Sequence, residues 1–152
     1  MITRLIIFLA INFGALALGS FFTSSEVTSQ WYLNLNKAPW SPPGWVFGAA
    51  WTTIMICFGL YMAYLWPNFE NKTLILSLYV LQLILNIGWN PTFFYYHNIQ
   101  LGLVVICLLT VLIGFMLFRY FPILKFKTLL IIPYFLWLLI ATSLNAYILF
   151  KN

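Results

Sequence analysis

The stretch LGLVVICLLTVLIGFMLF, residues 101–118, carries no charged side chain and decides the class of fold. A helix rises about 1.5 Å per residue, so roughly 18 or more apolar residues cross a hydrocarbon core about 30 Å thick. The apolar run extends on both sides to residues 99–120. We therefore predict a membrane-spanning helix here.

Four more apolar runs have a similar length. The chain is 64% hydrophobic and 6% charged, whereas soluble domains carry about 25% charged residues. The length suits one domain. The sequence thus predicts an all-α integral membrane protein, a single domain over residues 1–152, with a long structured loop at 24–43. The five predicted transmembrane helices are 4–23, 44–66, 73–94, 99–120 and 127–149.

The first run has an alternative interpretation. Arg4, the apolar stretch that follows it and the small residues near Gly19 resemble a secretory signal peptide. The apolar run continues through Phe21 and Phe22, however, which favours a retained helix. The start of the chain shows no other targeting segment, which is typical of a bacterial protein.

The basic residues predict an orientation in the membrane. Five of the seven fall on the side of the N-terminus, and two, Lys37 and Lys151, fall on the other side. The positive-inside rule then places the N-terminus in the cytoplasm, with the loop 24–43 and the C-terminus outside the cell membrane. The five are Arg4, Lys72, Arg119, Lys125 and Lys127. They are too scattered for a nucleic-acid surface, so lipid is the expected partner.

The third predicted helix carries amides at membrane depth. Gln82, Asn86 and Asn90 are spaced at i, i+4 and i+8, so they share one face. Trp89 and Phe93 fall on the same arc of about 100°. Such amides either bond to neighbouring helices or line a cavity. Three in a row favour a polar-lined cavity.

Two other helices present aromatic faces. The fifth aligns Tyr134, Trp137, Ala141 and Asn145 on one face. The second aligns a set of aromatic, thioether and glycine residues that, taken alone, is more typical of packing. Its members include Phe47, Trp51 and Met55. Together the three faces suit a flat, mostly apolar ligand with polar groups on its rim.

The segment WYLNLNKAPWSPPGWVFGAAW, residues 31–51, begins in the long loop and holds four of the seven tryptophans. Loops of about 20 residues are often functional, and prolines such as Pro42 stiffen this one. A lid over the bundle would use Trp31 and Tyr32 as apolar faces. An aromatic belt at the membrane interface explains Trp40 equally well. Lys37 either meets a ligand carboxylate or is solvated.

Three motifs in this order resemble the translocator protein family, also called TspO/MBR, the tryptophan-rich sensory proteins or the peripheral-type benzodiazepine receptor. They are the segment 31–51, QLILNIGWNPTFF at 82–94 and PYFLWLLIATSLN at 133–145. The resemblance covers the whole chain. It implies a five-helix bundle, commonly a homodimer, with a pocket capped by the first long loop.

The resemblance also implies ligands. The family binds tetrapyrroles of the protoporphyrin IX class and synthetic benzodiazepine-type or isoquinoline carboxamide compounds. Bacterial relatives are associated with light-dependent oxidative breakdown of the porphyrin, which needs light and oxygen but no further cofactor. Trp51 and Trp137 match the tryptophans implicated in that chemistry. The expected ligand-binding residues are Tyr32, Pro42, Phe47, Trp51, Met55, Gln82, Asn86, Trp89, Asn90, Phe93, Tyr134, Trp137, Ala141 and Asn145.

Conventional catalytic residues are scarce. The two acids, Glu26 and Glu70, lie outside the predicted helices, and the one histidine, His97, has no partner nearby in sequence. No metal site is expected. Three classes of function stay open: light-driven porphyrin degradation by pocket tryptophans, a non-catalytic sensor or carrier of tetrapyrroles or lipids, and a structural subunit. A loose L-x-Y-x-K sterol pattern ending at Lys151 is also explained by an interfacial anchor.

Overall fold

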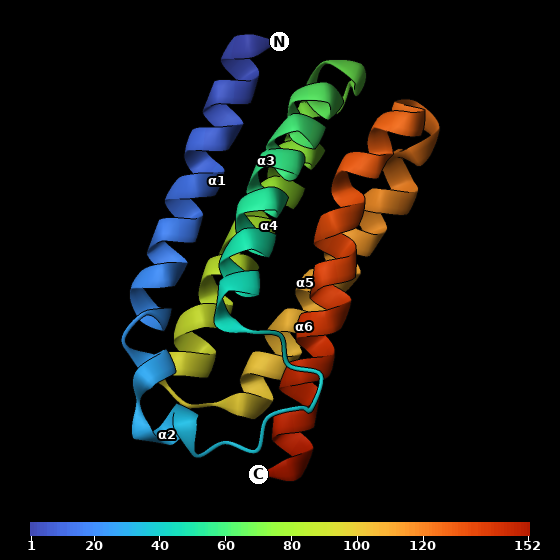
Figure 1. Ribbon diagram of the computed structural model, residues 1–152. Helices are drawn as coiled ribbons and strands as arrows, with labels where there is room; N and C mark the ends of the chain where they lie inside the picture. The colour runs from blue at the N-terminus through green and yellow to red at the C-terminus, as the bar shows by residue number, and fades with distance from the viewer.

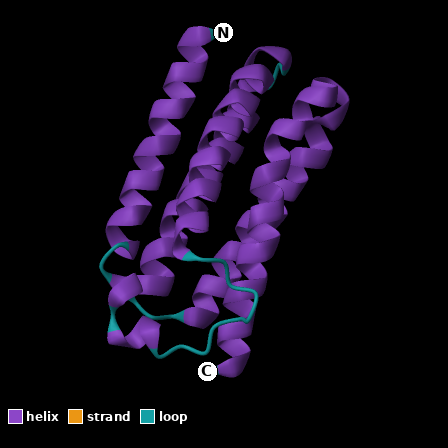
Figure 2. Cartoon of the chain, in the orientation of Figure 1, coloured by secondary structure: helices purple, strands orange, loops and turns teal.

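The computed structural model describes residues 1–152, and every regular element in it is helical (Figures 1 and 2). The five long helices are α1 (Ile2–Thr23), α3 (Gly44–Asn68), α4 (Lys72–Asn90), α5 (Ile99–Leu124) and α6 (Ile132–Lys151). The short segments are the 3-10 helix η1 (Glu26–Thr28), the single turn α2 (Gln30–Leu33), the π-helix η2 (Pro91–Tyr95) and the 3-10 helix η3 (Lys125–Ile131).

Four continuous helical stretches are long and apolar enough to cross a membrane. They are Ile2–Thr28, Gly44–Asn68, Lys72–Tyr95 and Ile99–Lys151. The last has 53 residues because it contains α5, η3 and α6 without an intervening loop.

The chain reverses direction through Lys125, whose φ is 51°, and the 3-10 helix η3 that begins there. The predicted helix end at residue 120 was therefore early, because α5 continues to Leu124. The predicted start at 127 was also early, because it falls within η3 and α6 begins at Ile132. Helix α5 takes Pro122 into its last turn, where the loss of one hydrogen bond is tolerated, and runs to Leu124.

The helices form one bundle with two distinct ends (Figure 1). We call the loop 24–43 the lid. At the lid end lie η1, α2, the remaining loop residues 34–43, η2 and the C-terminus. At the other end, called the amino-terminal end below, lie the N-terminus, the α3–α4 turn and the reversal at Lys125. Helix α1 packs on α3 and α4, and α5 packs on α4 and α6.

Polar groups at membrane depth fasten α1 to its neighbours. The Asn12 side chain is buried, and its Nδ2 donates to the backbone oxygen of Met55 at 3.1 Å. The Tyr79 hydroxyl donates to Asn12 Oδ1 at 2.7 Å. A buried amide in lipid is stabilised only by such partners, so α1 is fitted to this bundle as an integral helix.

Replacing Gly19 with leucine is expected to weaken the contact between α1 and α4. A Cβ at this position would lie 2.7 Å from Asn90 Nδ2, and the same amide accepts a hydrogen bond from Thr23 at 2.8 Å. Forcing that side chain away should lower the free energy of unfolding by about 1–3 kcal/mol. Gly14→Leu on the same helix is the control, because no atom lies within 4 Å of its Cβ position. Equal melting temperatures for the two variants in detergent would contradict this packing.

Candidate ligand site beneath the loop 24–43

An aromatic cluster joins α3 to α6 in the half of the bundle nearest the lid end. The rings of Phe47 and Trp137 meet edge to face with centroids 5.3 Å apart, and those of Trp51 and Tyr134 do so at 6.0 Å. Trp137 and Met55 are buried, whereas Trp51 is half-buried. The structure therefore brings together the aromatic faces that the helical periodicity predicted for these two helices.

A second aromatic group lies where α4 passes into η2. Trp89 stacks on Phe93 with centroids 5.3 Å apart and planes at 19°. Its indole N–H donates to Asn145 Oδ1 of α6 at 3.1 Å, and Asn145 Nδ2 donates to the backbone oxygen of Ile99 at 3.1 Å. The π-helical turn, closed by the Tyr96 N–H bonding to the Pro91 oxygen, buries both Phe93 and Phe94.

The Tyr134 hydroxyl is hydrogen-bonded to two side-chain amides at the centre of the bundle. It accepts hydrogen bonds from Gln82 Nε2 at 2.7 Å and from Asn86 Nδ2 at 2.9 Å. All three side chains are buried. These two amides thus hold α4 to α6, which is the alternative the sequence favoured less. One acceptor, Gln82 Oε1, is buried without a partner.

Asn90 turns away from the other amides. Its Oδ1 accepts from Thr23 of α1 and its Nδ2 donates to the backbone oxygen of Asn86 at 3.1 Å. Helix α4 packs against both α1 and α5, and an arc of about 100° on its surface reaches both sides. Shared periodicity therefore did not place Asn90 beside Tyr134. Ala141 is half-buried and packs against the main core.

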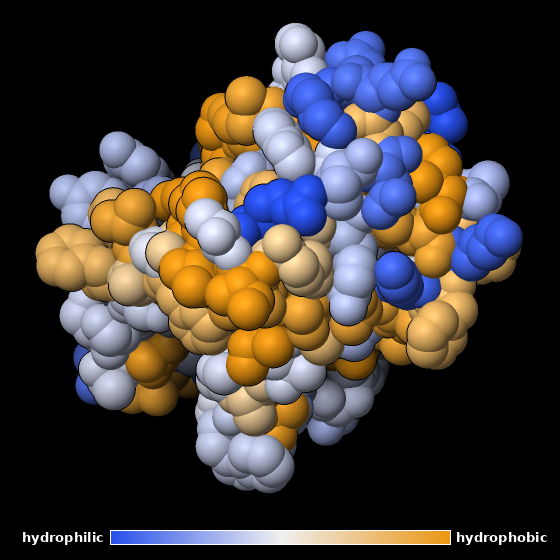
Figure 3. All heavy atoms as spheres, turned by 90° about the horizontal axis from the view of Figure 1, so that it is seen from above, coloured by the Kyte–Doolittle hydropathy of each residue, from blue (hydrophilic) through white to orange (hydrophobic).

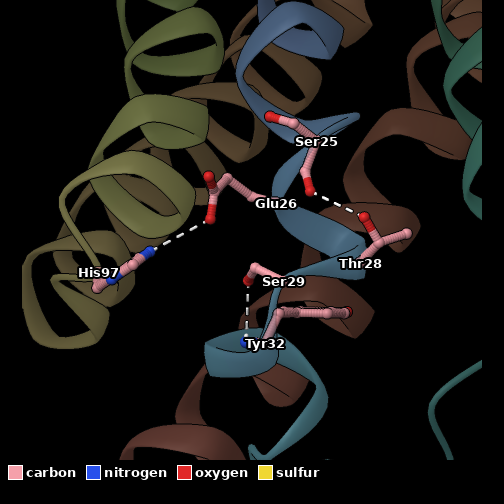
Figure 4. Close-up of polar contacts among 6 residues, drawn as sticks. All are labelled: Ser25, Glu26, Thr28, Ser29, Tyr32 and His97. Atoms are coloured by element: carbon pink, nitrogen blue, oxygen red, sulfur yellow. Dashed lines mark hydrogen bonds and ion pairs between the residues drawn. The ribbon is translucent and has the colours of Figure 1, made fainter.

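The lid is attached to the η2–α5 connection by what we call the His97 latch, made of Trp31, His97 and Glu26. The Trp31 indole stacks on the His97 imidazole with centroids 3.9 Å apart and planes at 12°. His97 Nε2 lies 3.4 Å from Glu26 Oε2 (Figure 4). The Trp31 ring also meets the edge of Phe93 at 5.7 Å.

The lid helix α2 is capped from within the lid, beside the His97 latch. Ser29 Oγ accepts a hydrogen bond from the Tyr32 backbone N–H at 3.2 Å, which satisfies one free donor at the start of α2 (Figure 4). Tyr32 is half-buried with its ring 5.6 Å from that of Phe94. Burial raises the pKa of the Tyr32 hydroxyl, so the group stays a hydrogen-bond donor.

The far part of the lid is attached to α6. Trp40 Nε1 donates to Ser143 Oγ at 3.1 Å, and its ring meets the edge of Tyr147 at 5.3 Å. Asn36 and Asn152 exchange hydrogen bonds, with the Asn36 N–H donating at 2.9 Å and Asn152 Nδ2 donating back at 3.3 Å. With Pro42 half-buried after them, these residues stretch the loop across the lid end.

The Lys37 side chain is half-buried against its own loop. Its Nζ donates to the backbone oxygen of Tyr32 at 2.6 Å and lies 4.4 Å from the centre of the Tyr32 ring. The ammonium group therefore folds back on the lid and stabilises it from within.

Sequence reasoning missed His97 as a structural partner of the lid. The available signal was topological: a five-helix chain places the connection after the third helix on the same side as the loop 24–43. His97 and Trp31 are therefore expected at the same end of the bundle, where their side chains can come into contact. Their pairing itself depends on the left-handed backbone of His97, with φ of 52°, which no pattern in the sequence indicates.

Comparison of the sequence with known proteins finds both a family profile and individual relatives that match most of the chain. The sequence profile described as the TspO/MBR family matches residues 6–151. The chain is similar to the tryptophan-rich protein TspO of Archaeoglobus fulgidus, at 33% identity over 100% of this chain and 96% of the relative. It is also 35% identical to the protein of that name in Chlorobaculum tepidum, over 88% and 86% of the two chains. The human translocator protein is 32% identical over 85% and 80%.

Proposed function

The chain belongs to the TspO/MBR family and is a multi-pass membrane protein, and we propose that it binds tetrapyrroles of the protoporphyrin IX class between its helices, beneath the loop 24–43. The observation that carries the proposal is the gathering of indole, phenyl and phenol rings in the lid half of the bundle. Flat apolar ligands are recognised by such rings together with a few polar groups.

The polar groups near these rings suit the rim of a tetrapyrrole. Asn145 and Trp89 form a hydrogen-bonded pair under the lid, and Gln82 Oε1 is a buried acceptor that a ligand N–H or O–H would satisfy. The lid covers this region through contacts of Trp31 with Phe93 of η2 and of Trp40 with Ser143 of α6. Ligand entry then requires the lid to detach on at least one side.

We propose that bound porphyrin is degraded when light and oxygen are present. The illuminated pigment supplies the photochemistry, and the protein holds an oxidisable indole close to it. Trp51 and Trp137 are the candidate residues, because they lie on facing helices and share an aromatic cluster through Phe47 and Tyr134. Neither general acid–base residues nor a further cofactor enter this mechanism.

Replacing Trp51 and Trp137 with phenylalanine is expected to slow light-driven pigment loss by about tenfold or more while dark affinity changes less. Phenylalanine keeps an aromatic face but removes the easily oxidised indole. Dark binding would be measured by quenching of tryptophan emission during titration with protoporphyrin IX, and pigment loss by absorption under illumination. Trp45→Phe is the matched control, since Trp45 is 74% exposed at the lid end of α3.

The outcomes separate the candidate functions. Saturable binding without protein-dependent pigment loss would make the protein a tetrapyrrole sensor or carrier. Unchanged loss in the double variant would exclude Trp51 and Trp137 as the residues responsible. Absence of saturable binding would contradict the proposal and leave the aromatic clusters as packing between helices.

The finer arrangement in the membrane is part of the same proposal. We propose that the stretch Ile99–Lys151 crosses twice, because α5 and α6 pack along each other after the reversal at Lys125. Five crossings with the basic amino-terminal end in the cytoplasm put the lid outside the cell membrane. A homodimer and binding of benzodiazepine-type or isoquinoline carboxamide compounds are further expectations from family membership.

A further inference from the structure

The amino-terminal end of the bundle carries most of the cationic side chains. Seen from above, hydrophilic side chains gather over one part of this end, beside apolar ones (Figure 3). Some of the cations already have partners: Lys72 Nζ donates to the backbone oxygens of Trp66 and Phe69, and Arg119 lies over the Phe69 ring at 5.7 Å. Arg119 nevertheless keeps an exposed side chain, and Lys125 and Lys127 are both exposed two residues apart, so the region of these two lysines is a compact basic surface.

A hollow of ≈ 420 Å³ lies in that region, between the end of α3 and the reversal into η3. Its lining residues are Asn68, Ile123, Leu124, Lys125, Phe126 and Lys127. The reversal places both lysines on the rim because Lys125 has a left-handed backbone. No acid lines the hollow, and the nearest in sequence is Glu70 in the α3–α4 turn.

The two ammonium groups keep donors for an anion. The Lys125 ammonium group has no hydrogen-bond or ion-pair partner within the chain, and that of Lys127 lies over the face of the Tyr64 ring at 4.2 Å. A contact of this kind leaves N–H groups free. Asn68 Nδ2 donates to the Tyr64 backbone oxygen at 2.7 Å and retains a second N–H.

Exposed apolar side chains lie beside the same hollow. Phe126 is 80% exposed and Leu129 is 55% exposed, both next to the lysines on η3. In a membrane protein these side chains reach the boundary between head groups and acyl chains. The surface therefore combines cations with apolar groups, which is the chemistry of an anionic amphiphile.

We propose that this hollow binds the head group of an anionic phospholipid, with Lys125 and Lys127 on its phosphate and the acyl chains along Phe126 and Leu129. Basic pockets at the ends of transmembrane helices bind such head groups, and each Lys or Arg near an anionic membrane contributes about 1 kcal/mol. The site is independent of the tetrapyrrole proposal, since it lies at the opposite end of the bundle. It holds α3 and the α5–α6 hairpin together through one lipid.

The test is lipid preference measured by mass spectrometry of the intact protein. Purified protein in neutral detergent would be mixed with equal amounts of phosphatidylglycerol and phosphatidylcholine. We expect the bound ratio to favour phosphatidylglycerol, to fall about fivefold in Lys125→Gln or Lys127→Gln, and to fall roughly 25-fold in the double variant. Lys151→Gln removes one charge from the other end and should leave the ratio unchanged.

Two results would overturn the proposal. One is a wild-type ratio near unity, or a ratio equal in wild type and double variant while both give the same helical circular dichroism. The other comes from inorganic phosphate: if millimolar phosphate alone displaces phosphatidylglycerol, the site recognises free phosphate instead of a lipid. Retention of the lipid in phosphate supports the contribution of the acyl chains.

Discussion

Tyr134→Phe is expected to lower the free energy of unfolding by about 2–4 kcal/mol, although it removes a single oxygen atom. The hydroxyl accepts from both Gln82 and Asn86, and all three side chains are buried. Without it, two amide donors remain in a medium that offers no water. An unsatisfied buried donor costs about 1–3 kcal/mol, with the lower values typical of membrane helices.

This prediction has both a control and a rescue. Tyr95→Phe removes a hydroxyl that has no hydrogen bond, from a side chain that is 63% exposed, so little change is expected. Adding Gln82→Leu and Asn86→Leu to Tyr134→Phe removes the stranded donors and should recover part of the loss. Unfolding would be followed by circular dichroism during titration with dodecyl sulfate in mixed micelles. A Tyr134→Phe curve that overlays the wild type would show that the hydroxyl does not hold α4 to α6.

Trp31→Ala is expected to release the lid at the η2 side. The indole contacts the rings of His97 and Phe93, and aromatic pairs contribute about 0.5–1.5 kcal/mol each beyond their buried area. A loss near 2 kcal/mol corresponds to roughly a 30-fold larger open population. Backbone amides of α2 should exchange with deuterium faster by that factor, and bound protoporphyrin should dissociate faster.

The matched comparison for the lid uses an exposed tryptophan. Trp45→Ala deletes the same side chain at a position that is 74% exposed and should leave exchange in α2 unchanged. Trp31→Phe retains a stacking face for His97 and should restore most of the protection. If His97→Ala and Trp31→Ala both left exchange in α2 as slow as in wild type, the latch would not be what holds the lid.

The long helices were predictable because lipid imposes a simple rule. The first four predicted runs begin within two residues of their helices, from Ile2 of α1 to Ile99 of α5. The errors fall where backbone geometry rather than hydropathy decides. Pro67 and Pro122 each lie in the last turn of a helix, where proline removes one hydrogen bond and its helix ends within two residues.

The sequence indicated which face of each helix points toward other helices, but not which side chain it contacts there. Helical periodicity correctly oriented Trp51, Trp137 and Asn145 toward other helices. It could not say that Asn90 would pair with Thr23 of α1, because a sequence does not specify which neighbour borders each side of an arc. Nor could it join His97 to Trp31, residues 66 positions apart whose contact depends on two connecting segments folding toward each other.

The π-helical turn η2 limits how the length of this segment can change during evolution. A π-helix accommodates an extra residue per turn, so the segment Pro91–Tyr95 behaves as a one-residue insertion in α4. Deleting any one of its residues would close this turn with α-helical spacing and change which side chains it buries, at present Phe93 and Phe94. In homologous sequences we therefore expect substitutions at exposed residues such as Tyr95 to be more frequent than insertions or deletions in this segment.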